Sequence, residues 1–167
     1  MSEVNFAPIL TLEEFAPIRN NLEGSLILTS GGYDPIHPGH ISCIVDSKTH
    51  GDYLVVVVNG DWFLDYKKGK HFMDLKTRSE IVSAIRGVDF VIPFEIEDDL
   101  TVNEALKVIH PDVFTKGGDR MDVDTIPEWE VCNDYGIRIV TGVGDSKTHS
   151  STNILEDWYE HRLRLFM

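Results

Sequence analysis

Two closely spaced histidines, His37 and His40, are the side chains of this sequence whose types and spacing suit chemistry on phosphate. They follow an apolar run over 26–29 and a glycine pair, and they stand where a helix over 41–48 is predicted to begin. The first turn of a helix has free backbone N–H groups and the positive end of the helix dipole, which both attract phosphate. Two imidazoles there can donate hydrogen bonds to phosphate oxygens, and Gly39 leaves room for close approach.

Two histidines three residues apart also occur by chance on helices and as half of a metal site. A metal site would need a third ligand of suitable type, and it would have no need of a glycine between the two histidines. In this sequence the pair follows a strand signal, opens a helix, and has Asp34 three residues ahead of His37. This context favours the phosphate-binding interpretation.

The composition describes an acidic, globular chain. A length of 167 residues suits one domain with a sizeable core, and 42% of the residues are hydrophobic. A formal net charge of −13 argues against nucleic acid and acidic membrane surfaces as partners, because both require basic patches. No apolar run approaches the ~20 residues of a membrane span, and the first residues lack the pattern of a signal peptide. Cys43 and Cys132 have no metal-type spacing, which fits reduced thiols in a cytoplasmic protein.

Strand and helix signals alternate along most of the chain. A helical extension over 1–24 precedes a domain over 25–167. Strands are predicted over 26–29, 53–58, 90–92, 112–115 and 137–140, and helices over 41–48, 76–86, 101–109, 127–135 and 151–166. This alternation predicts a Rossmann-like α/β fold, with a five-stranded parallel sheet and helices on both faces. Ligands of such sheets bind beyond the carboxyl ends of the strands, where the histidine pair falls.

Two further segments carry groups suited to a nucleotide. Ser150, Ser151 and Thr152 stand at the predicted start of the last helix, where hydroxyls and free N–H groups can bind phosphates, although a plain helix cap is the alternative. The glycines of the Lys116–Asp119 segment permit close approach of the backbone to a ribose or base. Its aspartate could accept a hydrogen bond from a ribose hydroxyl, or could simply be a turn residue.

A lysine-rich segment follows the second predicted strand. Lys67, Lys68 and Lys70 surround a glycine, and no apolar anchor follows until Phe72. Three lysines in an acidic chain suggest a mobile, phosphate-binding lid, and a solvated loop is the alternative.

Ordered blocks from Gly32 to Ile154 resemble the cytidylyltransferase-like branch of the nucleotidylyltransferase superfamily. The matching blocks are 32–40, 48–59, Arg78, 88–93, 116–119 and 150–154. The resemblance implies transfer of a nucleoside monophosphate from CTP or ATP to a phosphorylated sugar or alcohol, with pyrophosphate leaving. It implies in-line attack by an acceptor phosphate oxygen without a covalent enzyme intermediate, and Mg²⁺ held mainly by the triphosphate. Such a reaction needs positioning and neutralisation of oxygen charge more than a nucleophile.

The resemblance also implies roles for individual residues. His37 and His40 would stabilise charge on the bridging and α-phosphate oxygens. Lys48 would reach the acceptor and α-phosphates, with a solvated lysine at a helix end as the alternative. Arg78 would contact phosphate, with a surface ion pair to Glu80 or Asp74 as the alternative. Lys68 would bind the acceptor or a phosphate. The implied nucleotide-binding residues are Gly32, Tyr33, Asp34, Gly39, Gly117, Gly118, Asp119, Ser150, Ser151 and Thr152.

The sequence departs from the family pattern before the last block. Some branches have an arginine upstream of the Ser-Thr pair, and here Lys147 or His149 would have to replace it. This departure and the altered lysine-rich segment leave a catalytically silent nucleotide-binding module as an alternative. A coenzyme-biosynthesis adenylyltransferase of the same superfamily is a further alternative. Family members often form homodimers, and Trp158, Tyr159 and Phe166 on the last predicted helix are consistent with a dimer, although part of that helix is expected to cover the sheet.

Overall fold

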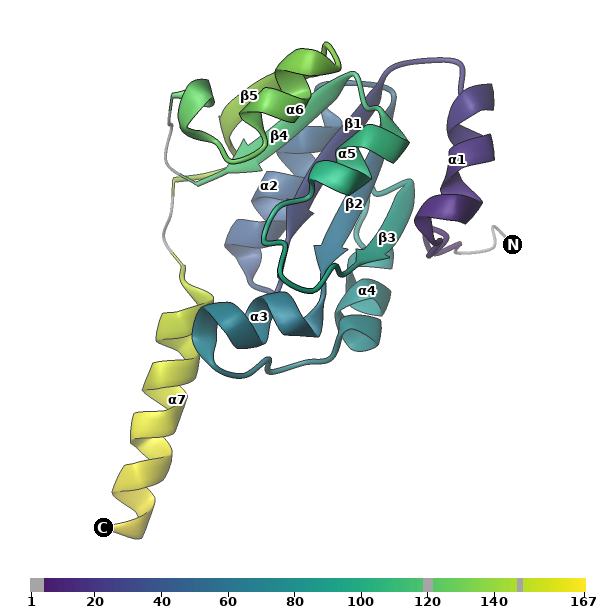
Figure 1. Ribbon diagram of the computed structural model, residues 1–167. Helices are drawn as coiled ribbons and strands as arrows, with labels where there is room; N and C mark the ends of the chain where they lie inside the picture. The colour runs from purple at the N-terminus through teal and green to yellow at the C-terminus, as the bar shows by residue number, and fades with distance from the viewer. Residues whose placement is uncertain (1–4, 119–121, 147–148) are drawn as a thin grey trace.

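A five-stranded parallel sheet forms the centre of the protein in a computed structural model, which describes residues 5–118, 122–146 and 149–167. The strands, in the order β3-β2-β1-β4-β5 across the sheet, are β1 (Leu26–Gly31), β2 (Tyr53–Asn59), β3 (Phe90–Phe94), β4 (Val113–Gly117) and β5 (Arg138–Val143). The first strand, β1, lies in the middle of the sheet, with β2 and β3 on one side of it and β4 and β5 on the other (Figure 1). The order therefore reverses between β1 and β4, where open α/β sheets bind ligands.

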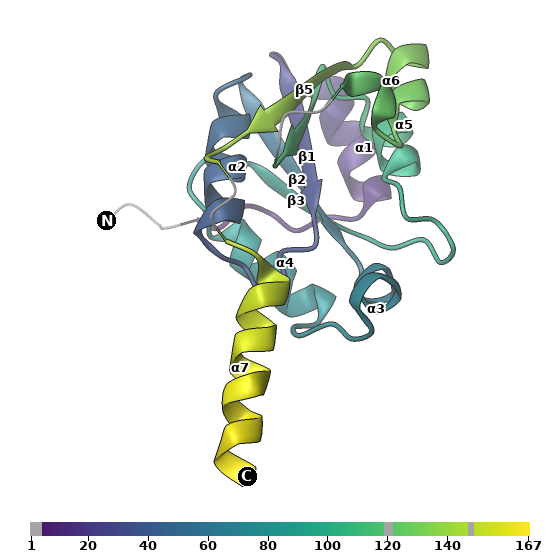
Figure 2. The same cartoon turned by 90° about the vertical axis from the view of Figure 1, so that its left-hand side faces the viewer.

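Helices cover both faces of the sheet, as the alternating pattern predicted (Figures 1 and 2). The helices are α1 (Leu12–Asn21), α2 (Pro38–Lys48), α3 (Asp61–Lys68), α4 (Leu75–Ser83), α5 (Asn103–Ile109), α6 (Trp129–Asp134) and α7 (Ser151–Phe166), with a short 3-10 turn over Val123–Thr125. Side chains of α1, α5 and α6 pack into the core of one face, and those of α2 and α4 pack into the core of the other.

Strand β2 shows why the sheet is covered on both sides. The unbroken apolar run 54–58 is fully buried, which is typical of a parallel strand between two helical layers. Because side chains alternate along a strand, Val55 and Val57 join one core, whereas Leu54, Val56 and Val58 join the other.

The N-terminal extension is part of the same core. Thr11 and Glu14 form the predicted capping box, in which the backbone N–H of Glu14 donates to Thr11 Oγ1 at 3.1 Å and that of Thr11 donates to Glu14 Oε2 at 2.8 Å. Phe15 of α1 is fully buried and packs edge-to-face on Phe90, with the ring centroids 5.1 Å apart. Burial of this ring holds α1 against the edge strand β3.

The lysine-rich segment is not the unanchored lid that the sequence analysis expected. Lys67 and Lys68 form the last turn of α3, and the helix ends at Gly69, whose φ is 88°. The following backbone is fixed by the buried carboxylate of Asp34, which accepts hydrogen bonds from the N–H groups of Phe72 at 2.7 Å and Met73 at 2.8 Å. The segment is therefore anchored to the loop between β1 and α2.

The last helix also departs from expectation, because α7 extends away from the sheet instead of covering it (Figures 1 and 2). It has no buried residue, and large side chains such as Trp158 and Phe166 are exposed to 60% and 77%. Its first turn nevertheless contacts the body of the protein. Within the described residues, no helix has both the length and the apolar character needed to cross a membrane.

Candidate functional site

A cavity of about 590 Å³ opens at the carboxyl ends of β1 and β4, at the reversal of the strand order. It brings together residues from three separate predicted blocks: Tyr33, His37, Gly39 and His40, then Gly117 and Gly118, then Ser150, Ser151 and Thr152. The clustering of distant segments on one ligand-sized cavity supports a single binding site. Asp119 and Lys147, which the sequence analysis also singled out, lie outside the described residues.

The two histidine rings are held in a fixed orientation at the start of α2. Their centroids are 3.8 Å apart and the rings are stacked at 22°. The backbone N–H of Gly39 donates to His37 Nδ1 at 3.1 Å, and the backbone N–H of His37 donates to His40 Nδ1 at 3.3 Å. Because each Nδ1 accepts a hydrogen bond, the proton of each neutral ring lies on Nε2. Both rings can then donate an Nε2–H hydrogen bond to an anion.

Burial keeps these rings neutral in the free protein. Removal from water, with smaller contributions from the nearby His37 ring and the charge of Lys68, lowers the pKa of His40 to about 4. Burial, with a smaller contribution from His149, also lowers the pKa of His37. The pair therefore meets an anion as two neutral donors, and negative charge beside them will favour proton uptake.

The pKa of His40 predicts a pH effect on stability. An unfolded chain has an ordinary histidine pKa near 6.5, so between about pH 6.5 and 4 it binds more protons than the folded chain. The free energy of unfolding should therefore fall as the pH falls through this window. Thermal melts at pH 7, 6 and 5 should show a smaller decline for His40→Ala than for the native protein. A constant difference between the two proteins across these pH values would contradict the assignment.

The loop between β1 and α2 supports the two histidine rings. Tyr33 has a left-handed φ of 54°, its ring is buried, and it meets the His40 ring edge-on with the centroids 5.4 Å apart. Asp34 is also buried and forms an ion pair with Lys68, whose Nζ lies 3.2 Å from Asp34 Oδ2 and also donates to the Asp34 carbonyl. Lys68 is thereby held close enough to His40 for its charge to lower the pKa of that ring.

The structure does not bring Lys48 to this cavity. It lies at the far end of α2 from the histidines, where its Nζ is 2.6 Å from Asp89 Oδ2 and 2.5 Å from the carbonyl oxygen of Asp52. These contacts join the end of α2 to the starts of β2 and β3, so the geometry gives Lys48 a structural role in place of the expected phosphate contact.

Arg78 is neither the phosphate ligand nor the surface ion pair that the sequence suggested. Its side chain is fully buried and donates to the carbonyl oxygens of Gly32, Asn59 and Met73 and to Asp61 Oδ1. A guanidinium has five N–H donors in a rigid fork, and here they join the loop after β1, the end of β2 and the start of α3 to the loop that precedes α4. Arg78 therefore positions the backbone of the site without reaching the cavity.

The third block caps α7 beside the first loop. Ser150 Oγ accepts a hydrogen bond from the backbone N–H of Asn153 at 3.4 Å, which makes Ser150 the predicted N-cap. Ser151 Oγ donates to the carbonyl oxygen of Pro35 at 2.9 Å and so ties the start of α7 to the histidine loop. His149 also lines the cavity, with its ring 5.7 Å from that of His37, which makes it the described candidate for the missing family arginine.

Lys116, for which no role was predicted, lines the cavity directly before the two glycines. Its Nζ lies 3.2 Å from Oε2 of Glu128, a buried carboxylate at the start of α6, and 5.1 Å from the centre of the Phe114 ring. Its position immediately after a predicted strand was the signal that could have identified it.

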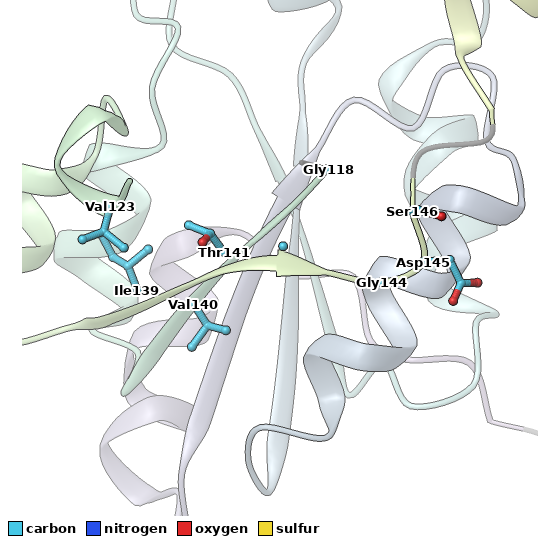
Figure 3. Close-up of a pocket in the computed structure, with 9 residues that line it drawn as sticks. Gly118, Val123, Ile139, Val140, Thr141, Gly144, Asp145 and Ser146 are labelled. Carbon is cyan, nitrogen blue, oxygen red and sulfur yellow. The ribbon is translucent and has the colours of Figure 1, made fainter. Parts of the chain in front are cut away.

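A second pocket of about 530 Å³ continues from the first cavity along the end of β5 (Figure 3). The two share Gly118 and Asp145. Figure 3 shows Val123 and Ile139 at one end of this pocket and Asp145 at the other. An apolar end and a polar end in one groove suit a planar base joined to a hydroxylated sugar.

Two glycines that lie against Cys43 of α2 help to shape these pockets. A Cβ built on Gly117 would lie 2.4 Å from Cys43 Sγ, and one built on Gly144 would lie 2.8 Å from the Cys43 backbone nitrogen. Gly144 also has a left-handed φ of 84°. The absence of side chains lets β4 and the loop after β5 close onto α2.

The sequence model of one family, described as cytidylyltransferase-like, matches residues 28–156. The bifunctional protein HldE of Desulfatibacillum aliphaticivorans is 34% identical over 156 residues, which is 90% of this chain and 31% of that protein. The bifunctional protein HldE of Methylococcus capsulatus is 32% identical over 149 residues, which is 87% of this chain and 30% of that protein. The chain thus spans about a third of the length of these curated relatives.

Solved structures give the same picture of the fold. The lipopolysaccharide core biosynthesis protein from Thermoplasma volcanium has a TM-score of 0.61 at 25% identity, over 74% of this chain and 99% of that chain. A pantoate-beta-alanine ligase from Francisella tularensis has a TM-score of 0.60 at 16% identity, over 87% of this chain and 69% of that chain, which is a likeness of fold alone. Because the family match includes β1, the histidine pair and the start of α7, the chain belongs to the cytidylyltransferase-like family of nucleotidyltransferases.

Proposed function

We propose that this protein transfers CMP or AMP from CTP or ATP to a phosphorylated sugar or polyol and releases pyrophosphate. The observation that carries the proposal is the pair of Nε2–H donors that His37 and His40 present to a cavity beside Lys68. The second pocket at the end of β5 offers space for the nucleoside. Family membership supports the reaction class. The pyrophosphate-release assay described below distinguishes CTP from ATP as the donor.

The proposed mechanism relies on positioning and on charge stabilisation. The histidines and the free N–H groups of the first turn of α2 would hold the oxygens of the α-phosphate. Ser151 and Thr152, in the first turn of α7, would face the β- and γ-phosphates. Lys68 would bind the phosphate of the acceptor, whose oxygen attacks the α-phosphorus in line with the departing pyrophosphate. No side chain of the protein becomes covalently attached.

Mg²⁺ fits this site as an ion that the triphosphate brings. Among the described residues, no group of three or more His, Cys, Asp or Glu side chains is placed to hold a metal ion. The carboxylate of Asp34 is already engaged with two backbone N–H groups and Lys68. Phosphate oxygens and water, which Mg²⁺ prefers, would therefore supply most of its ligands. When bound, the ion would neutralise charge on the leaving pyrophosphate.

Pyrophosphate release tests the reaction class. The protein would be incubated with Mg²⁺ and each of CTP, ATP, GTP and UTP, against glycerol 3-phosphate, hexose 1-phosphates, heptose 1-phosphate and a phosphorylated coenzyme precursor. Release is expected only when a triphosphate and an acceptor are both present. Turnover with a coenzyme precursor alone would favour the coenzyme-biosynthesis alternative. Triphosphate binding without turnover on any acceptor would contradict the proposal and favour a catalytically silent module.

The hydroxyls at the start of α7 predict a ligand effect on stability. CTP or ATP with Mg²⁺ should raise the melting temperature, because a ligand that binds only the folded state stabilises it. The double variant Ser151→Ala, Thr152→Ala should reduce this shift, since it removes two groups that face the phosphates. Asn153→Ala, one residue further along the same turn, is the matched control. An undiminished shift in the double variant would argue against a phosphate role for this block.

The exposed face of α7 supports a homodimer as a second proposal. Ile154, Trp158 and Leu165 form one apolar stripe of the helix and are exposed to 41%, 60% and 61%. Acidic residues fill the middle of the helix, at 156, 157 and 160, and basic residues follow, at 161, 162 and 164. Antiparallel pairing of two copies of α7 would place the acidic part of one helix against the basic part of the other, which favours a second copy of this chain as the partner.

Light scattering tests the dimer. The native protein at micromolar concentration is expected to have twice the mass of one chain, and Trp158→Glu together with Leu165→Glu should give the single-chain mass. Tyr135→Glu changes an exposed aromatic residue elsewhere and should leave the mass unchanged. A native protein with the mass of one chain would refute the proposal.

A further inference from the structure

Tyr33, the second residue after the end of β1, has a backbone conformation that tyrosine rarely adopts. Its φ of 54° lies in the left-handed region, which disfavours bulky side chains and suits glycine. A glycine at this position would form the same turn without strain, so the turn alone does not account for a tyrosine. Strained residues of this kind are concentrated at functional sites, and the contacts of the ring therefore indicate what the tyrosine does.

The Tyr33 ring folds back over β1 and packs against His40. A Cβ built on Gly31 would lie 2.9 Å from Tyr33 Cζ, so the ring occupies the space directly over this glycine. The ring centroids of Tyr33 and His40 are 5.4 Å apart with the planes at 79°, and Tyr33 is only 5% exposed. Tyr33 thus offers little surface to a nucleotide, and its ring forms one wall of the space around the His40 imidazole.

Burial, more than charge, sets the protonation state of His40. Removal from water is the largest cause of its low pKa, ahead of the His37 ring and the charge of Lys68. The charge of Lys68 is itself compensated by Asp34, whose Oδ2 lies 3.2 Å from Lys68 Nζ. Tyr33 adds no charge, because burial raises the pKa of its hydroxyl. Among the described residues, the titratable side chains around the two histidine rings are Tyr33, Asp34, Lys68 and His149.

We infer that Tyr33 is a positioning residue for His40, because its ring shields one side of the imidazole from water and fixes the orientation in which His40 donates from Nε2. Protonation and orientation are linked here. A protonated Nδ1 cannot accept the hydrogen bond that the His37 backbone N–H donates at 3.3 Å, so a His40 that gains a proton loses this anchor. The kinetic part of the inference rests on the proposed function and deepens it, whereas the protonation of His40 can be measured without turnover.

Proton NMR of the seven histidines in the free protein tests the shielding, with the His40 signal identified by its absence from His40→Ala. In Tyr33→Gly, which removes the ring and suits the left-handed backbone, the pKa of His40 should rise from about 4 to about 5 or higher. Tyr33→Asn should act in the same way, because asparagine also tolerates positive φ, and it provides a second ring deletion if the glycine variant does not fold. Tyr33→Phe keeps the ring and should keep the low pKa.

Tyr135→Gly is the matched control. It removes a tyrosine that lies beside a different histidine, His110, with the ring centroids 5.7 Å apart. Both the pKa of His40 and the turnover should be native in this variant.

Turnover tests the positioning role. The kcat of Tyr33→Gly should fall about tenfold, which is less than the loss expected for His40→Ala, because the donor is misplaced but still present. Tyr33→Phe should recover the lost kcat. A native kcat in a ring-deletion variant whose His40 pKa has risen would refute the positioning role.

The NMR result separates failure of this inference from failure of the proposed function. An unchanged His40 pKa in the folded ring-deletion variants, or a raised one in Tyr33→Phe, would overturn the inference even if the native protein turns over. A raised pKa in the ring-deletion variants, with no turnover of the native protein on any substrate pair, would refute the proposed function and leave the shielding of His40 by Tyr33 in place. Thermal melts of each variant establish that it is folded.

Discussion

Replacing His40 with alanine is expected to lower turnover by roughly 10²–10³-fold, because one hydrogen-bond donor aimed at developing oxygen charge typically stabilises a transition state by about 2.7–4 kcal/mol. His40 is suited to this role because its Nδ1 is occupied by the backbone of His37 and its Nε2–H is available to the α-phosphate. The loss should appear in kcat more than in the KM of the triphosphate, because the charge on the bridging oxygen is greatest in the transition state.

The measurement is steady-state pyrophosphate release by the native protein and the variant, with thermal melts of both. His50→Ala is the matched control, because His50 follows the other end of α2 and is remote from the histidine pair. It should leave turnover unchanged. Near-native turnover in His40→Ala would refute the mechanism, and a loss explained by unfolding would be visible in the melting curve.

Replacing Arg78 with alanine is expected to lower the free energy of unfolding by about 3 kcal/mol or more, because it leaves three carbonyl groups and Asp61 without their donor and removes a fully buried side chain. For a chain of this size the melting temperature should fall by about 10 °C. Turnover should fall as well, because the loop that carries Tyr33 and the histidines loses one of its anchors.

Thermal unfolding of Arg78→Ala, Arg78→Lys and Arg86→Ala provides the test. Lysine retains the charge but not the planar fork, so Arg78→Lys should restore only part of the stability. Arg86 is exposed, and its replacement should change the free energy of unfolding by no more than about 0.5 kcal/mol. Equal effects at positions 78 and 86 would contradict the structural role assigned to Arg78.

The fold and the centre of the site could be predicted because both rest on local patterns. The run 54–58 is apolar at every position, which indicates a strand covered on both faces. The alternation of such runs with helices is compatible with only a few sheet topologies. His37 and His40 belong to a single turn, so their spacing alone sets their relative position. The prediction of a five-stranded Rossmann-like sheet is confirmed.

Long side chains were harder to place, because their direction depends on distant backbone. Lys48 was expected at the phosphates, but its partner is Asp89, which lies 41 positions away in the sequence. Arg78 draws its carbonyl acceptors from the loop after β1, the end of β2 and the loop before α4, and no local pattern predicts such a convergence.

Helix α3 was missed although the sequence carries its signals. Asp61 stands in the first turn, Lys67 and Lys68 stand in the last, and Gly69 follows, which is the charge and glycine order of a helix. Lysines suit both a phosphate ligand and the negative end of a helix dipole, so their presence alone does not distinguish a binding loop from the end of a helix.

Cys43 sets different limits on how the two glycines beside it can change during evolution or design. At Gly117 the obstacle to a side chain is the cysteine's own sulfur at 2.4 Å, whereas its Cβ is 3.4 Å away. A Gly117→Ala change therefore becomes sterically acceptable once Cys43→Ala has occurred, so the residues at these two positions can be substituted together. At Gly144 the obstacles include the backbone nitrogen and Cα of residue 43, at 2.8 and 2.9 Å, which no substitution at position 43 removes. Gly117 can thus be replaced after a compensating change at Cys43, whereas no change at Cys43 makes room for a side chain at Gly144.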